Sequence, residues 1–173
     1  MLSAESAAGK YPEQAVAMMH AIAMETESKD EYRDAIKQLH LQSPPDIAFA
    51  ITASVREIAE TTDIKAICCF SQSGTTAILA ARERPCVPIL ALTNNRNIAR
   101  QLSLVWGLRC IVVDPVDRFR HAVKAAINTA RACGVACGSE QIVITAGIPF
   151  NTPGSTNILR VASVDASDIN LGT

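Results

Sequence analysis

The sequence predicts an α/β fold, a three-layer αβα sandwich built on a mostly parallel five-stranded sheet. Four short runs, at 64–70, 87–92, 108–113 and 141–145, are almost uniformly apolar, as strands are when a parallel sheet is covered on both faces. Helical patterns with short connections separate the runs, and this alternation indicates a doubly wound sheet. A fifth run, at 157–164, follows the loop 147–156, and we expect this last strand to be antiparallel.

Residues typical of helix starts and ends predict where the helices lie. Pro12 suits a first helical turn, and apolar residues recur on one face up to residue 25. The segment 43–46 has the spacing of a capping box with Ser43 as N-cap, so a helix should follow with Ile47 on its apolar face. Further helices are expected at 75–84, at 95–106 before Gly107, and at 116–132 before Gly134, the last after a second capping pattern at 114–117.

Composition and charge exclude some classes of binding partner and indicate a cellular compartment. The chain has 173 residues and a formal net charge of −1 without a basic cluster, so neither nucleic acid nor an anionic membrane surface is an expected partner. Its N-terminus lacks the pattern of a signal peptide, and no apolar run is long enough to span a membrane. We therefore expect a cytoplasmic protein.

The cysteines and histidines predict neither disulfides nor metal. No CxxC pair occurs among the six cysteines, and several lie in apolar runs, which favours buried reduced thiols. Cys133 and Cys137 are the exception, because two thiols around a glycine could meet under oxidation; a redox role for them is left open. The three histidines lie far apart in the sequence, so we expect no metal site.

One polar loop has the properties of a phosphate site. It joins the first expected strand to a helix, where helix N–H groups lack partners and hydroxyls can donate to an anion. The candidate residues are Ser71, Gln72, Ser73, Gly74, Thr75 and Thr76. The alternative, equally favoured by this loop alone, is a Ser/Thr-rich cap that satisfies its own helix. Neither a hydrolase elbow nor a P-loop is present.

A second polar loop precedes the last expected strand. In a doubly wound sheet the loops after the strands surround one crevice, so this loop could close over a ligand held by 71–76, or it is a plain surface turn. Its candidate residues are Asn151, Thr152, Gly154, Ser155 and Thr156.

The order of these loops within a longer pattern resembles the pyruvate kinase family. Residues 1–16 resemble the end of that family's catalytic barrel, 71–76 its effector phosphate loop, 84–93 its next strand, and 146–157 its closing loop. The resemblance covers nearly the whole chain. It implies segments at 1–26 (the barrel's last strand and helix), 27–42 (a charged, solvated connector), 43–166 (the C-terminal α/β domain) and 167–173 (a tail).

The resemblance also implies function. It implies an allosteric domain that binds the phosphate of a sugar-phosphate activator, helps to assemble a homotetramer and works with the remaining pyruvate kinase domains. The family's catalytic residues and its magnesium and potassium sites lie in the barrel. An eight-fold barrel needs about 250 residues, so this chain should hold no cofactor and no catalytic residue, and alone it should be inactive in making pyruvate and ATP from phosphoenolpyruvate and ADP.

Two departures from the family limit the ligand. Gln72 stands where some relatives have Lys, and 148–151 lacks the Trp-Arg-Pro-Gly of relatives that bind a doubly phosphorylated sugar. We therefore favour a sugar monophosphate such as ribose 5-phosphate or glucose 6-phosphate, or AMP. The alternatives are a phosphosugar isomerase domain, whose loop resembles 71–75, and an assembly module that binds nothing.

Overall fold

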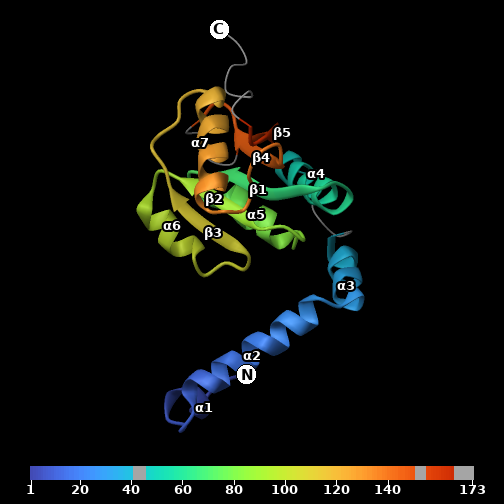
Figure 1. The fold of residues 1–173 in the computed structure, drawn as a ribbon, viewed down its shortest axis with the longest axis vertical. Coiled ribbons are helices and arrows are strands. Elements are labelled where there is room, and N and C mark those ends of the chain that lie inside the picture. The colour runs from blue at the N-terminus through green and yellow to red at the C-terminus, as the bar shows by residue number, and fades with distance from the viewer. Residues whose placement is uncertain (41–45, 151–154, 166–173) are drawn as a thin grey trace. The chain divides into compact units, whose positions relative to one another are not determined.

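The computed structural model describes residues 1–40, 46–150 and 155–165, and the chain divides into two compact units, residues 1–43 and 44–173 (Figure 1). The candidate site lies in the second unit.

The first unit is helical. It holds α1 (Ala4–Ala7), α2 (Pro12–Glu27) and α3 (Asp30–His40). The predicted helix α2 is confirmed, with Pro12 in its first turn. None of its residues is buried, and Val16, Met19 and Ile22 are exposed. The charged stretch expected to be a connector contains α3, whose first turn holds Asp30 and Glu31, as is typical of a helix start; its role as a connector stays a prediction. The assignment of 1–26 to a barrel stays a prediction.

The second unit is built on a five-stranded sheet in the order β3-β2-β1-β4-β5. The pairs β1–β2, β1–β4 and β2–β3 are parallel, and β4–β5 is antiparallel, which confirms the predicted topology. The strands are β1 (Ile64–Phe70), β2 (Ile89–Thr93), β3 (Leu108–Val112), β4 (Gln141–Gly147) and β5 (Thr156–Ser163).

Helices cover both faces of this sheet, so the three-layer prediction is confirmed (Figure 1). On one face α7 (Phe119–Ala132) packs Ala126 and Ile127 against the sheet. On the other face lie α4 (Ile47–Thr61), α5 (Thr75–Arg82) and α6 (Arg96–Leu102). Six of the seven residues of β1 and all five of β2 are buried, which explains why their sequences are apolar on both faces.

The predicted starts of two helices were wrong. The N-cap of α4 is Asp46 and not Ser43, because the Asp46 carboxylate accepts a hydrogen bond from the Ala48 N–H at 2.7 Å. Ile47 then points away from the core and is 71% exposed. Helix α7 begins at Phe119 and not at residue 116, and Asp117 bonds the side chain of His121 instead of capping the helix. Helix α6 ends at Leu102, before the predicted end at 106.

The strand order fixes where a ligand can bind. The chain leaves β1 in one direction to form β2 and β3, and returns on the other side of β1 to form β4. The carboxyl ends of β1 and β4 therefore flank the topological switch point, which is where open α/β sheets bind their ligands.

Candidate functional site: a crevice at the carboxyl edge of the sheet

The turn from β1 to α5 depends on a glycine. The Ser71 N–H donates to the Leu92 carbonyl at 3.0 Å and so continues the pairing of β1 with β2. Gly74 then takes φ +90 as the N-cap of α5. A Cβ there would lie 3.1 Å from Leu102 Cδ2, so both the backbone conformation and the close approach of α6 favour a residue without a side chain.

The N-terminus of α5 is not capped by a side chain. Gly74 supplies no capping oxygen, and Ser73 Oγ lies 3.5 Å from the Thr75 nitrogen and only 3.0 Å from the Thr75 hydroxyl. The first turn of a helix has N–H groups without helical partners. The N-cap residue itself thus leaves the start of α5 open, and the side-chain contact made there is the long one from the Thr75 N–H to the Ser73 hydroxyl.

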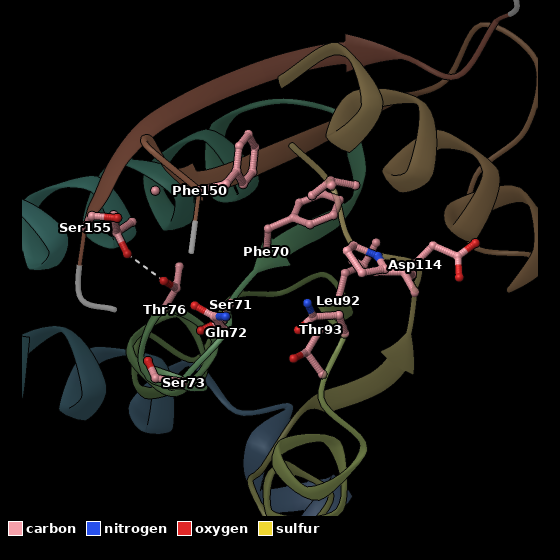
Figure 2. A pocket seen from close by; sticks show the side chains of 16 residues that line it. Phe70, Ser71, Gln72, Ser73, Thr76, Leu92, Thr93, Asp114, Phe150 and Ser155 are labelled. Carbon is pink, nitrogen blue, oxygen red and sulfur yellow. Dashed lines mark hydrogen bonds between the residues drawn. The ribbon is translucent and has the colours of Figure 1, made fainter. Parts of the chain in front are cut away.

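A pocket of about 70 Å³ opens beside this turn (Figure 2). It is lined by residues at the ends of β1, β2 and β4 and by those that follow β3. Its apolar lining consists of Phe70, Leu92, Val113, Pro115, Val116 and Phe150, and its polar lining includes Ser71, Gln72, Ser73, Thr76, Thr93, Asn94, Ser155 and Thr156. The pocket therefore has polar groups of residues 71–76 on one side and apolar side chains on the other.

The structure brings most of the expected site residues together. Ser71, Gln72, Ser73 and Thr76 line the pocket, while Gly74 shapes the turn and Thr75 is exposed at the helix start. From the second loop, Ser155 and Thr156 line the same pocket, as expected of a loop that closes over 71–76. Asn151, Thr152 and Gly154 lie outside the described residues.

Sequence reasoning missed the part of the pocket that β2 and β3 supply. Thr93 and Asn94 end β2 and follow it, and Val113 to Val116 follow β3. The signal was available, because the carboxyl ends of parallel strands meet at one edge of the sheet. The residues after every expected parallel strand are therefore candidates, whereas the expected site drew only on those after the runs at 64–70 and 141–145.

Two buried hydroxyls connect the two loops. Thr76 and Thr156 are 6% and 4% exposed, and their Oγ1 atoms lie 2.5 Å apart. The base of the second loop is held by Asn157, whose side chain accepts from the Ile148 N–H at 2.9 Å and donates to the Ile148 carbonyl at 2.6 Å. Gly147 passes so close to Ser155 that a Cβ would lie 2.9 Å from the Ser155 carbonyl oxygen.

The pocket carries little charge of its own. Among the lining residues that the structure describes, Asp114 is the charged one, and no Lys or Arg is present. In Figure 2 the Asp114 carboxylate points away from Ser71 and Ser73. Arg82 ends α5, at the opposite end of that helix from the pocket, and lies over the Phe49 ring at 5.0 Å, while Arg84 lies over the Trp106 ring at 4.2 Å. An anion here would be held by N–H and O–H groups.

The thiols are only partly buried as expected. Cys68 and Cys69 are buried in β1, and burial raises the pKa of the Cys68 thiol to about 12, which makes it a poor nucleophile. Cys86 and Cys137 are exposed, against expectation, because they lie in connections outside the strands. All six thiols are free. The redox role of Cys133 and Cys137 stays open.

The described residues contain no group of three or more His, Cys, Asp or Glu side chains that could hold a metal ion. No helix within the same residues has the length and apolar character needed to cross a membrane.

These features define an α/β domain with a ligand crevice at the carboxyl edge of its sheet. Residues 49–162 match the family of the pyruvate kinase alpha/beta domain. The chain is 39% identical over 161 residues to pyruvate kinase from Geobacillus stearothermophilus, covering 93% of this chain and 27% of that protein. It is 40% identical over 161 residues to pyruvate kinase from Agrobacterium vitis, covering 93% of this chain and 34% of that protein.

A solved structure has the same fold. The crystal structure of a pyruvate kinase from Cryptosporidium parvum superposes with a TM-score of 0.81 at 23% identity, over 95% of this chain and 33% of that one. The chain belongs to the pyruvate kinase family and is its C-terminal α/β domain. It spans about a third or less of the length of these relatives.

Proposed function

We propose that this chain is the allosteric and oligomerisation domain of a pyruvate kinase and binds a sugar monophosphate, or AMP, in the crevice beside 71–76. The observation that carries the proposal is the uncapped N-terminus of α5, which opens onto a pocket lined by hydroxyl side chains from both predicted loops. N–H groups at a helix start and the helix dipole favour a bound anion.

The polar groups available are sufficient for a phosphate. A hydrogen bond to a charged group contributes roughly 1.5 to 3 kcal/mol, and micromolar affinity corresponds to about 8 kcal/mol. Three or four such bonds from N–H groups of α5 and the hydroxyls of Ser71, Ser73 and Thr75 are therefore enough. Ser73 and Thr75 are exposed and already directed toward each other at 3.0 Å.

A single phosphate fits the pocket better than two. The lining described above holds no cation that could receive a second phosphate, and its far side is apolar, with Phe70, Leu92 and Phe150. A volume of about 70 Å³ also favours a small ligand. A ligand whose phosphate lies against residues 71–76 and whose uncharged sugar lies against the apolar residues would match both parts of the lining.

The isomerase interpretation is not favoured by the same lining. An aldose–ketose isomerisation needs groups that move protons. Among the described lining residues Asp114 is the one acidic side chain and none is His, and its carboxylate points away from Ser71 and Ser73 (Figure 2).

Further parts of the proposal concern the whole enzyme. Phosphoryl transfer, with its magnesium and potassium ions, belongs to a barrel outside this chain, and the domain acts in the cytoplasm within a homotetramer. The 173-residue chain should form no ATP from phosphoenolpyruvate and ADP with both ions present. ATP formation that depends on the pure chain would contradict this assignment.

The decisive test is calorimetric titration with ribose 5-phosphate, glucose 6-phosphate and AMP. Ribose is the matched control, because it lacks only the phosphate. We expect at least one of the three phosphates to bind in the micromolar to millimolar range and ribose not to bind. Absence of binding by all three phosphates would favour the assembly-module interpretation.

A further inference from the structure

We propose that Thr156 is a positioning residue for the phosphate site, acting through Thr76. The inference rests on the proposed function and assigns Thr156 a task within it. Thr76 stands in the first turn of α5, and Thr156 is the first residue of β5, 80 positions later in the sequence. The hydrogen bond that ends at Thr76 in Figure 2 joins them.

Both side chains are more than nine-tenths buried and both line the pocket. Among the residues that the structure describes, each hydroxyl has the other as its hydrogen-bond partner, with the oxygens 2.5 Å apart. A buried hydroxyl without a partner is costly, so this contact restrains the rotamers of both side chains. The first turn of α5 is thereby tied to the strand that follows the second loop.

The Thr76–Thr156 pair has one hydroxyl hydrogen left to donate to a ligand. A hydroxyl has one hydrogen and two acceptor sites, so the pair has two hydrogens, and one of them lies between the two oxygens. The second hydrogen stays available to the pocket. When Thr156 donates to Thr76, the Thr76 O–H is free to donate to a phosphate oxygen, and a hydroxyl that accepts a hydrogen bond is a stronger donor.

The same geometry relates Thr156 to the second loop. Thr156 lies directly before Asn157, whose side-chain amide bonds the Ile148 backbone through both its oxygen and its nitrogen. It also follows Ser155, which lies in close contact with Gly147. The position of the Thr156 hydroxyl is therefore fixed by β4 and by the base of the loop, and Thr156 transmits that position to Thr76.

Substitution of both threonines separates positioning from direct contact. We expect Thr156→Val, which keeps the shape and removes the hydroxyl, to raise the Kd of ribose 5-phosphate about tenfold. Thr156→Ser should restore the affinity to within about twofold of the wild type. If Thr156 acts through Thr76, Thr156→Val should change the Kd by less than about twofold in a Thr76→Val background.

The chain offers a matched control for loss of a buried threonine hydroxyl. Thr145 in β4 is fully buried, and its Oγ1 has no hydrogen-bond partner among the described residues. It does not line the pocket. Thr145→Val should therefore leave the Kd unchanged, and thermal melts of every variant would show whether each remains folded.

The outcomes distinguish this inference from the proposed function. If the wild type binds ribose 5-phosphate and Thr156→Val binds it equally well, the positioning role is wrong and the proposed function stands. If the effects of Thr76→Val and Thr156→Val on the Kd multiply, Thr156 contacts the ligand independently and the inference is also wrong. If the wild type binds none of the three phosphates named above, both proposals fall together.

Discussion

Two strand-to-helix turns lie next to each other at the carboxyl edge of the sheet and end differently. The turn from β2 to α6 is closed by Asn95, whose side-chain oxygen accepts from the N–H groups of Asn97 and Ile98 at 2.9 and 3.3 Å. The turn from β1 to α5 has Gly74 at the equivalent position and no side-chain cap. The turns touch, since Gly74 faces Leu102 and Ile98 of α6.

The difference shows how a binding site is made from a common local structure. An Asn at the N-cap satisfies the helix and stabilises it by about 1 kcal/mol. A Gly at the N-cap leaves the same N–H groups to water or to a ligand. We infer that the side-chain cap of the α6 turn contributes to stability and the uncapped N–H groups of the α5 turn contribute to binding, and four substitutions test that division.

The largest effect is expected from a carboxylate at the start of α5. Thr75 is the exposed first residue of that helix, so Thr75→Glu places a negative charge where the phosphate would bind without burying it. We expect the affinity for ribose 5-phosphate to fall at least about a hundredfold, because repulsion replaces several charged hydrogen bonds. Arg96→Glu, at the same position of α6, is the control and should change the Kd less than about threefold by calorimetry.

Gly74→Ala should lower the free energy of unfolding by about 2 kcal/mol, the next largest effect. An L-residue at φ +90 is strained, and the new methyl group would lie 3.1 Å from Leu102 Cδ2. Gly107→Ala, at φ +71 with nothing within 4 Å, should cost about 1 kcal/mol. Equal losses in urea denaturation would show that the contact with α6 does not constrain the α5 turn.

Ser73→Ala should weaken binding without weakening the fold. Ser73 is exposed, and its hydroxyl lies 3.0 Å from the Thr75 hydroxyl and accepts from the Thr75 N–H at the long distance of 3.5 Å. We expect the Kd of ribose 5-phosphate to rise about fivefold to tenfold and the free energy of unfolding to change by less than about 0.5 kcal/mol. A drop in stability comparable to that of a lost N-cap would mean that Ser73 caps α5 after all.

Asn95→Ala should lower the stability without weakening binding, and its effect should be the smallest of the four. Loss of two N–H contacts at the start of α6 should lower the free energy of unfolding by about 1 kcal/mol. The Kd of ribose 5-phosphate should stay within about twofold of the wild type. A tenfold rise in that Kd would show that the two turns share one function, and the comparison would fail.

The sequence predicted the sheet well because burial on both faces leaves a strong local signal. All seven residues of 64–70 form the central strand, and the run at 141–145 marks the next strand on the other side. Helix starts were predicted less well, because short polar segments contain several possible caps. The segment 43–46 offers both Ser43 and Asp46, and the structure has Asp46 as the N-cap, with its side chain accepting from the Ala48 N–H.

The site was predictable in its local part and not in its long-range part. The loop 71–76 is one continuous segment whose glycine and hydroxyls are visible in the sequence. The bond between Thr76 and Thr156 depends instead on the pairing of β1, β4 and β5, which sets Gly147 opposite Thr156. No pattern in either segment specifies that pairing, and a shift of one residue would turn Thr156 to the other face of the sheet.

The two hydrogen bonds between the Asn157 side chain and the Ile148 backbone have a consequence for ligand preference at this site. Because the side chain of Asn157 bonds the backbone of Ile148, the paired ends of β4 and β5 are held together outside residues 149–154, and Thr156 in β5 keeps its contact with Thr76 of α5. Doubling the length of a loop costs only about 0.6 kcal/mol in chain entropy. We infer that replacing residues 149–154 would change the ligand preference at this edge of the sheet at little cost in stability, separately from the proposed phosphate turn at the start of α5.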